Sequence, residues 1–306
     1  MIDYPFASHF LDLPPLVTHP TPLTTHQCGI RYHYLDEGAG EPIVMLHGNP
    51  TWSYYYRRLV VALRDGYRVI VPDHIGCGLS DKPDDSHYPY TLARRVDDLE
   101  ALLDHLKVDQ GLTLVLHDWG GIIGMAYASR RPERIKRLVV LNTAAFHLPA
   151  GKRLPWSLRL FRNPILGPFL VRGLNAFCRG AAKYCCTRRP MPPEVRQAYL
   201  APYDSYSHRI AILRFVQDIP LQPGDGCYDL VSEIQNGLSR FRNVPMLICW
   251  GEKDFVFDND FLAEWTRRFP EVEVHRFPDA GHYVLEDAPA EIIPLVRSFL
   301  QRHPFE

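Results

Sequence analysis

An aspartate occupies the turn between a predicted strand and a predicted helix in LVLHDWGGIIGMA, residues 114–126. Two apolar runs flank the motif HDWGG, and many hydrolytic enzymes use such a strand, glycine-assisted turn and helix to present a serine. A carboxylate there can instead displace a leaving group from a saturated carbon and form an alkyl-enzyme ester. An isolated aspartate before a helix usually only caps that helix. The flanking strand, the glycine pair and the partners described next favour Asp118 as a nucleophile.

A histidine and an acid complete the candidate constellation. His282, in DAGHYVLEDAP, follows the last predicted strand, and Asp254, in WGEKDFVFD, follows the strand before it. A loop histidine is by default merely exposed, but this order of nucleophile, acid and histidine is typical of enzymes with such a turn. Asp254 would orient and charge-stabilise the imidazole of His282. Asp258 and Asp260 are close alternatives for the acid, and Asp279 is a distant one.

Hydrogen-bond donors form the third part of the candidate site. The backbone N–H groups of Asn49, after VMLHG, and of Trp119, beside Asp118, would form an oxyanion hole. Their side-chain amide and indole N–H groups would point to the same place and hold a departing anion. The alternatives are that Trp119 only packs in the core and that Asn49 only forms a turn. His47, His74 and His117 lie beside strand ends, and we interpret them as structural.

Composition and charge describe a globular chain with no strong overall field. The 306 residues are 46% hydrophobic and carry a formal net charge of −1, so the total charge predicts no attraction to nucleic acid or to an anionic membrane. No apolar run approaches the roughly 20 residues that span a bilayer. Seven cysteines without zinc-site spacing or a secretory signal predict a reducing, cytoplasmic setting. We expect no metal and no organic cofactor.

Strands alternate with helices along most of the chain, which predicts an α/β fold with a mostly parallel sheet covered by helices on both faces. In such sheets the active residues collect in loops at the carboxyl ends of the strands. Asp118, Asp254 and His282 all occupy such positions. The segment 147–240 breaks the alternation with short helical pieces rich in proline, arginine and aromatic residues. We therefore expect a core of residues 1–146 and 241–306 with a mainly helical cap, 147–240, inserted in it.

Four motifs carry a family resemblance: HGNPTWSYYYRRL, PDHIGCGLSDKP, HDWGG and DAGHY. Together they resemble the haloalkane dehalogenase branch of the α/β-hydrolase fold, over nearly the whole chain outside the cap. Fluoroacetate dehalogenases are less similar because they carry an arginine soon after the nucleophile. Epoxide hydrolases share HDWGG but usually have an aromatic residue at the position of Asn49 and protonate the epoxide with two cap tyrosines. The cap tyrosines here are Tyr184, Tyr199, Tyr203, Tyr206 and Tyr228.

Two positions indicate the branch within this family. Several dehalogenases take their acid from a glutamate after the strand that follows the nucleophile helix, where RLVVLNTAAF has Asn142 and no carboxylate. The resemblance therefore implies Asp254 as the acid, as in the third dehalogenase-like subgroup. The loop from His74 to Gly78 resembles the β-lactone decarboxylases of bacterial long-chain olefin biosynthesis. Those enzymes convert cis-3,4-dialkyl β-lactones to cis-alkenes and carbon dioxide.

The resemblance implies β-lactone decarboxylation first, haloalkane dehalogenation second and epoxide hydrolysis third. Attack of Asp118 on the alkyl carbon would expel a carboxylate, and loss of carbon dioxide with departure of Asp118 would give the cis-alkene. Attack on the lactone carbonyl, giving a mixed anhydride, stays open. A non-catalytic receptor would be expected to have lost part of the triad. The expected ligand is a small hydrophobic substrate, and the resemblance implies a β-lactone synthetase and other enzymes of the olefin pathway as partners.

Overall fold

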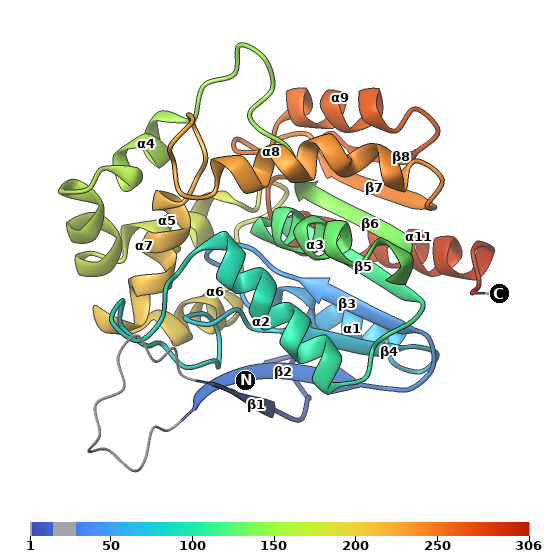
Figure 1. Cartoon of the computed structure of the whole chain (residues 1–306). Helices are drawn as coiled ribbons and strands as arrows, with labels where there is room; N and C mark the ends of the chain where they lie inside the picture. The colour runs from blue at the N-terminus through green and yellow to red at the C-terminus, as the bar shows by residue number, and fades with distance from the viewer. Residues whose placement is uncertain (1, 15–28, 306) are drawn as a thin grey trace.

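A computed structural model of the chain describes residues 2–14 and 29–305. Within them, eight strands form one sheet in the order β1-β2-β4-β3-β5-β6-β7-β8 (Figure 1). The strands are β1 (His9–Leu13), β2 (Ile30–Glu37), β3 (Pro42–Leu46), β4 (Arg68–Pro72), β5 (Leu112–Asp118), β6 (Ile135–Thr143), β7 (Met246–Gly251) and β8 (Glu273–Phe277).

The sheet is parallel from β4 through β8, and β2 pairs antiparallel with both β1 and β4. Every residue of β5 is buried, as is every residue of β7. A strand covered on both faces needs such a continuous apolar run. The predicted mostly parallel sheet is confirmed.

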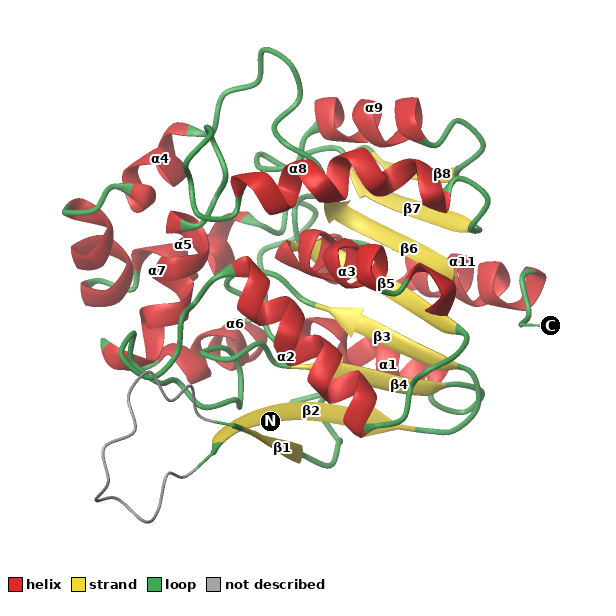
Figure 2. Cartoon of the chain, viewed as in Figure 1, coloured by secondary structure: helices red, strands yellow, loops and turns green. Residues whose placement is uncertain are grey.

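Helices cover both faces of this sheet (Figure 2). Helices α2, α3 and α8 pack together on one face, and α1 and α11 pack together on the other. None of the helices in the described residues is long and apolar enough to cross a membrane. The helices are α1 (Arg57–Leu63), α2 (Leu92–His105), α3 (Trp119–Arg130), α4 (Trp156–Arg162), α5 (Ala176–Tyr184), α6 (Pro193–Leu200), α7 (Ile210–Gln217), α8 (Tyr228–Gly237), α9 (Asn259–Arg268), α10 (Val284–Asp287) and α11 (Pro289–Arg302).

Local sequence signals explain how two of the helices begin. The hydroxyl of Thr91 accepts a hydrogen bond from the backbone N–H of Arg94 at 3.3 Å and so caps the start of α2. Helix α3 begins with Gly120 and Gly121, where an added Cβ would lie 1.9 Å from the Leu46 carbonyl and 1.9 Å from the Thr143 hydroxyl. The glycine pair lets α3 lie directly against the sheet, with Asp118 at its start.

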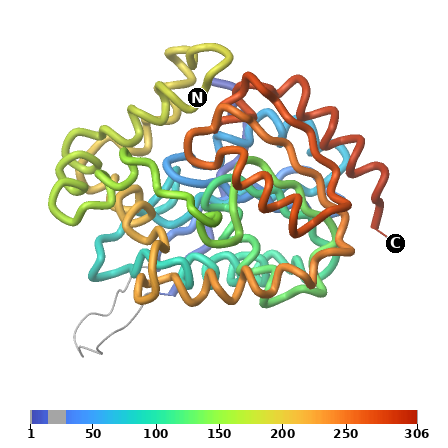
Figure 3. Tube along the Cα trace, turned by 90° about the horizontal axis from the view of Figure 1, so that it is seen from above, coloured from blue at the N-terminus to red at the C-terminus, as the bar shows by residue number. Residues whose placement is uncertain are grey.

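The segment between β6 and β7 contains the helices that lie beyond the carboxyl ends of the parallel strands. Helices α4, α5, α6 and α7, with the π-helical turn η3 (Pro168–Gly173), form a group at the end of the molecule opposite the C-terminus (Figures 1 and 3). Helix α8 also falls within the range 147–240, yet it packs against α3 beside the sheet. We therefore propose that the cap ends before α8, and that α8 belongs with the core.

Candidate active site

The backbone at the end of β5 turns sharply and places Asp118 at the apex. Asp118 has φ 51° and ψ −126°, a backbone conformation that residues other than glycine rarely adopt. Such strained residues persist only where the surrounding structure holds them. The hydroxyl of Thr143 donates to the Asp118 carbonyl, and the two glycines hold α3 close behind it. The result is a carboxylate that is only 7% exposed and that faces a cavity.

Two backbone N–H groups stabilise the Asp118 carboxylate. The Asn49 N–H donates to Oδ1 at 2.7 Å, and the N–H of Trp119 also favours the charged form. Burial raises the pKa of the Asp118 carboxyl, and the opposing effects of His282 and of these two N–H groups do not cancel the rise. The donors expected for an oxyanion hole therefore lie at the carboxylate itself.

The side chains of Asn49 and Trp119 occupy different surroundings. The Asn49 amide donates to the carbonyl of Ile212 in the cap at 3.1 Å, which engages one of its two N–H bonds. The indole of Trp119 lines the cavity and packs against Phe215, with ring centroids 5.2 Å apart. Asn49 therefore connects the core loop to α7 of the cap, beside the nucleophile.

His282 lies between two carboxylates. Its Nδ1 is 2.7 Å from Asp254 Oδ2, and its Nε2 is 3.5 Å from Asp118 Oδ2. Burial disfavours the charged imidazole, but Asp254 and then Asp118 outweigh burial and raise the pKa of His282 above its ordinary value. With Nδ1–H donating to Asp254, Nε2 faces the candidate nucleophile. This arrangement can act as a base toward water or stabilise an anion next to Asp118.

The structure brings only one of the four candidate acids to His282. Asp254 is almost fully buried, and its other oxygen accepts from the N–H groups of Val256 and Phe257. Asp258 caps α9 and, like Asp260, pairs with Lys152. Asp279 pairs with Arg188 at the surface.

Asn142 is a positioning residue whose contacts sequence reasoning missed. Its Nδ2 donates to the Gly251 carbonyl at 2.9 Å and to Asp254 Oδ2 at 3.1 Å, and its Oδ1 accepts from the Gly251 N–H at 2.8 Å. It thus ties the end of β6 to β7 and orients Asp254. The sequence signal that could have found this role was the position of Asn142 at the strand end where related enzymes carry an acid. Only the packing of β6 beside β7 shows that Asn142 contacts Asp254.

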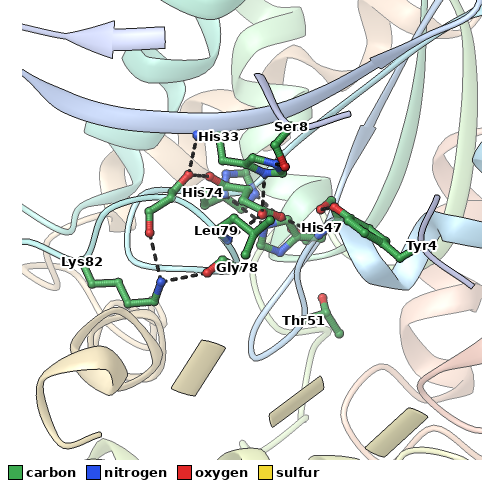
Figure 4. A network of polar contacts seen from close by, with 12 residues as sticks. Tyr4, Ser8, His33, His47, Thr51, His74, Gly78, Leu79 and Lys82 are labelled. Atoms are coloured by element: carbon green, nitrogen blue, oxygen red, sulfur yellow. Dashed lines mark hydrogen bonds and ion pairs between the residues drawn. The ribbon is translucent and has the colours of Figure 1, made fainter. Parts of the chain in front are cut away.

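The three histidines interpreted as structural all make internal hydrogen bonds. His117 Nε2 lies 2.9 Å from the His282 carbonyl and supports the histidine loop. The backbone N–H of His74 donates to His47 Nε2, and His74 Nε2 lies 3.1 Å from the His47 carbonyl (Figure 4). Burial lowers the pKa of each of the three imidazoles. All three therefore stay neutral near pH 7, and the His47–His74 pair holds the loop that carries Asn49.

A buried hydrogen bond between a histidine and an aspartate supports the same loop from the side of β2. His33 Nδ1 lies 2.8 Å from Asp73 Oδ2, and Asp73 Oδ1 accepts from the Ser53 N–H. Burial opposes the charge of Asp73, but His33, His47 and the Leu79 N–H together outweigh burial and lower the pKa of Asp73 to about 2. The network in Figure 4 thus joins β2, the loop after β3 and the loop after β4.

Asp118, Asn49, Trp119 and His282 line a cavity of about 680 Å³ between core and cap. Most of its wall is apolar; the contributing side chains include Ile122, Phe146, Leu158, Phe161, Phe177 and Val216. Of the five tyrosines predicted to lie in the cap, Tyr184 alone lines this cavity. Tyr199 donates to Glu286 and Tyr203 to the Thr51 carbonyl, so neither is placed to protonate a substrate there.

Fold and site together define the class of protein, and residues 41–289 match the family model of the alpha/beta hydrolase fold. The chain belongs to this family. It is 56% identical to a cis-3-alkyl-4-alkyloxetan-2-one decarboxylase of Shewanella oneidensis, over 97% of this chain and 89% of that protein. It is 50% identical to a decarboxylase of the same name from Xanthomonas campestris pv. campestris, over 90% of this chain and 94% of that protein.

A solved structure supports the wider resemblance. The haloalkane dehalogenase of Agrobacterium tumefaciens C58 matches with a TM-score of 0.81 and 26% identity, over 97% of each chain. The resemblance that the four motifs carry, to dehalogenase-like α/β-hydrolases and more specifically to β-lactone decarboxylases, is confirmed.

Proposed function

We propose that this chain decarboxylates cis-3-alkyl-4-alkyloxetan-2-ones, which are β-lactones, to cis-alkenes and carbon dioxide. The observation that carries this choice is the 56% and 50% identity, over nearly the whole chain, to two decarboxylases of that name. The site is compatible with it, because a buried carboxylate faces an apolar cavity that suits alkyl chains.

In this proposal Asp118 attacks the alkyl-substituted ring carbon that is bonded to the ring oxygen. A bond forms between that carbon and a carboxylate oxygen, and the ring C–O bond breaks to release a carboxylate on the neighbouring carbon. The C–C bond to this carboxylate then breaks, its electrons form the alkene, and Asp118 departs with its own oxygen. Attack inverts the carbon and anti loss of carbon dioxide follows, so a cis-lactone gives a cis-alkene. No proton and no water is consumed.

Other side chains would assist without forming bonds to the substrate. The His282 imidazolium, whose pKa Asp254 raises, would stabilise the expelled carboxylate or Asp118 as it departs. The N–H groups of Asn49 and Trp119 would hold the Asp118 carboxylate in its attacking orientation. Attack on the lactone carbonyl, giving a mixed anhydride, would use the same residues and leave the ring oxygen on the alkyl chain.

A substrate comparison tests the function directly. Purified protein receives a cis-dialkyl β-lactone, a 1-halogenated alkane or a terminal epoxide, and gas chromatography follows the products. We expect a cis-alkene from the lactone and little halide release. Fast halide release with an inert lactone would instead establish haloalkane dehalogenation. A diol formed from the epoxide, with the other two substrates inert, would establish epoxide hydrolysis.

Solvent oxygen distinguishes the two leading reactions at Asp118. After many turnovers in H₂¹⁸O, decarboxylation leaves the Asp118 peptide unlabelled because Asp118 departs with its own oxygen. Dehalogenation labels it, because water attacks the carbonyl of the alkyl ester. Mass spectrometry of that peptide measures whether ¹⁸O has been incorporated.

We further propose a place for this chain in bacterial olefin biosynthesis. The reaction that supplies its substrate must close a β-lactone, so a β-lactone synthetase is the expected partner enzyme. The reducing setting suggested by the cysteines favours the cytoplasm.

A further inference from the structure

Exposed apolar side chains concentrate on one part of the cap. Six of the twelve large hydrophobic side chains that are exposed in the described residues lie within residues 156–184, a segment that makes up less than a tenth of the chain. This segment comprises α4, η3 and α5, and Phe161 packs edge-to-face on Phe177 to join α4 to α5. The six are Trp156, Ile165, Leu166, Phe169, Leu174 and Tyr184. Exposed apolar side chains concentrated in this way indicate an interaction surface.

The same part of the cap is strongly basic. Residues 147–200 contain ten Lys and Arg and a single acidic residue, Glu194, although the whole chain has a net charge of −1. Arg159, on α4, and Arg179 and Lys183, on α5, are exposed and pair with no carboxylate of the described residues. The near-neutral total charge therefore conceals a local concentration of positive charge in the cap, which the expectation from total charge does not address.

The active-site cavity opens at this surface. Trp156 and Tyr184 line the cavity and yet are 78% and 60% exposed, so they stand at its mouth, with Phe255 of the core beside them. Tryptophan and tyrosine have an apolar body and a polar edge, which suits them to the boundary between lipid and water.

We propose that the surface formed by α4, η3 and α5 docks on an anionic lipid bilayer, with the cavity mouth facing the lipid. The apolar side chains would enter the headgroup boundary, and the unpaired cations would bind anionic headgroups. The proposal rests on the proposed function only for the identity of the molecules that pass between lipid and cavity. A dialkyl lactone and its alkene are oily molecules that dissolve in a bilayer, and they would enter and leave the cavity without crossing water.

The chemistry of this surface favours a lipid surface over an acidic protein. The unpaired cations stand on two helices, α4 and α5, and the same segment carries the six exposed apolar side chains. Interfacial binding needs only buried apolar area and diffuse charge attraction, whereas a specific protein interface needs packed pockets around buried anchor residues.

Vesicle flotation tests the proposal with the full chain. The vesicles contain either equal parts of phosphatidylglycerol and phosphatidylcholine or phosphatidylcholine alone, at about 0.1 M and about 0.5 M NaCl. We expect the protein to bind the anionic vesicles at the lower salt, with weaker binding at the higher salt because exposed charges are then screened. Neutral vesicles should bind it less at either salt.

Matched variants locate the surface. Replacing Arg159, Arg179 and Lys183 with Gln should weaken partition into anionic vesicles by about fivefold per residue, equivalent to about 1 kcal/mol for each Lys or Arg near the membrane. The control replaces three exposed basic residues of the core with Gln and removes the same charge; they are Arg58, Lys136 and Arg242.

A second pair of variants tests the apolar contribution. The double change Ile165→Ser and Phe169→Ser removes exposed apolar groups that do not line the cavity, and it should weaken partition by about tenfold or more. Its control is Phe10→Ser with Val61→Ser, at exposed positions of β1 and α1. Circular dichroism confirms that each variant is folded.

Absence of binding to anionic vesicles at low salt would overturn the proposal, and so would equal losses in the cap variants and their controls. In that case an acidic protein would become the favoured partner of this surface. The outcome is independent of the proposed function, because turnover is measured separately on lactone dispersed in detergent. Vesicle binding without lactone turnover refutes only the function, and turnover without vesicle binding refutes only the docking.

Discussion

At the scale of single residues, the chemistry of this protein depends on one carboxylate kept out of water. Asp118 is buried, accepts hydrogen bonds from backbone N–H groups and lies 3.5 Å from the imidazole of His282. Burial disfavours its charge and thereby raises its pKa, so the ionised nucleophile is held at a cost in folding stability. The same poor solvation leaves the carboxylate free to attack an alkyl carbon.

Asp118→Asn should lower turnover by roughly 10⁴-fold or more, as loss of a nucleophile does in related triads, while leaving the fold intact. Asparagine has nearly the same shape as aspartate, so it fits the same position in the turn after β5. Activity is measured with the dialkyl lactone, and mass spectrometry verifies that the amide has not hydrolysed. Full activity in the verified variant would remove Asp118 from the mechanism.

The stability of this variant should depend on pH with a defined sign. An unfolded aspartate titrates near pH 3.9, and the folded Asp118 titrates higher. Between these two pKa values the folded wild type holds more protons than the unfolded chain, so its stability falls as pH rises through that window. Asp118→Asn has no carboxyl group at this position and therefore does not lose stability in this way. Its melting temperature relative to wild type should therefore rise from pH 4 to pH 8, and a difference that stays flat would contradict the raised pKa.

At the scale of elements, three segments at the carboxyl ends of parallel strands meet around the nucleophile. The loop after β3 brings Asn49, the turn after β5 brings Asp118, and the loop after β8 brings His282. The His47–His74 pair supports the first loop, and the His117 contact supports the last. The site therefore depends on close approach between backbones as much as on the catalytic side chains.

Gly48→Ala tests this close approach. A Cβ at residue 48 would lie 2.0 Å from Asp118 Oδ1, so the carboxylate or the loop must move. A displacement of about 1 Å in an active site can cost roughly 100-fold in rate, and we expect at least this loss of kcat. The control is Gly66→Ala, where nothing lies within 4 Å of an added Cβ. Equal activity in the two variants would show that the loop yields without disturbing Asp118.

At the scale of the whole molecule, the cap is fastened to the core next to the catalytic histidine. Asp287 accepts hydrogen bonds from the backbone N–H groups of Thr187 and Arg188 in the cap, and from Gly281, which precedes His282. The Tyr283 N–H also donates to the Cys185 carbonyl. Cap position and histidine position are therefore coupled through one carboxylate.

Asp287→Asn should lower both stability and turnover. The amide keeps one acceptor oxygen but turns N–H donors toward backbone N–H groups, and each lost hydrogen bond to a charged group is worth about 1.5–3 kcal/mol. We expect a loss of about 2 kcal/mol in the free energy of unfolding, measured by urea denaturation, and about tenfold in kcat. Asp279→Asn is the control, because its exposed ion pair with Arg188 is worth at most about 1 kcal/mol. Similar losses in both variants would contradict a special role for Asp287.

The sequence alone determined the fold class, the motif set and the position of the candidate nucleophile. These follow from short-range patterns: an apolar run, a glycine pair behind Asp118, and the order of strands and helices. A local pattern can be read without knowing what packs against it, because strand geometry and turn geometry depend mainly on neighbouring residues. The family resemblance comes from the same local motifs.

Only the tertiary structure decided which groups meet. Asp254 was one of four candidate acids in the sequence, and the position of β7 between β6 and β8 brought it to Asn142 and to His282. The packing of α8 on α3 likewise moved the proposed end of the cap, and the folding of residues 156–184 placed the exposed Trp156 and Tyr184 at the cavity mouth. Contacts between residues a hundred positions apart depend on how whole elements stack. The periodicity and spacing of residues in the sequence do not reveal how these elements pack.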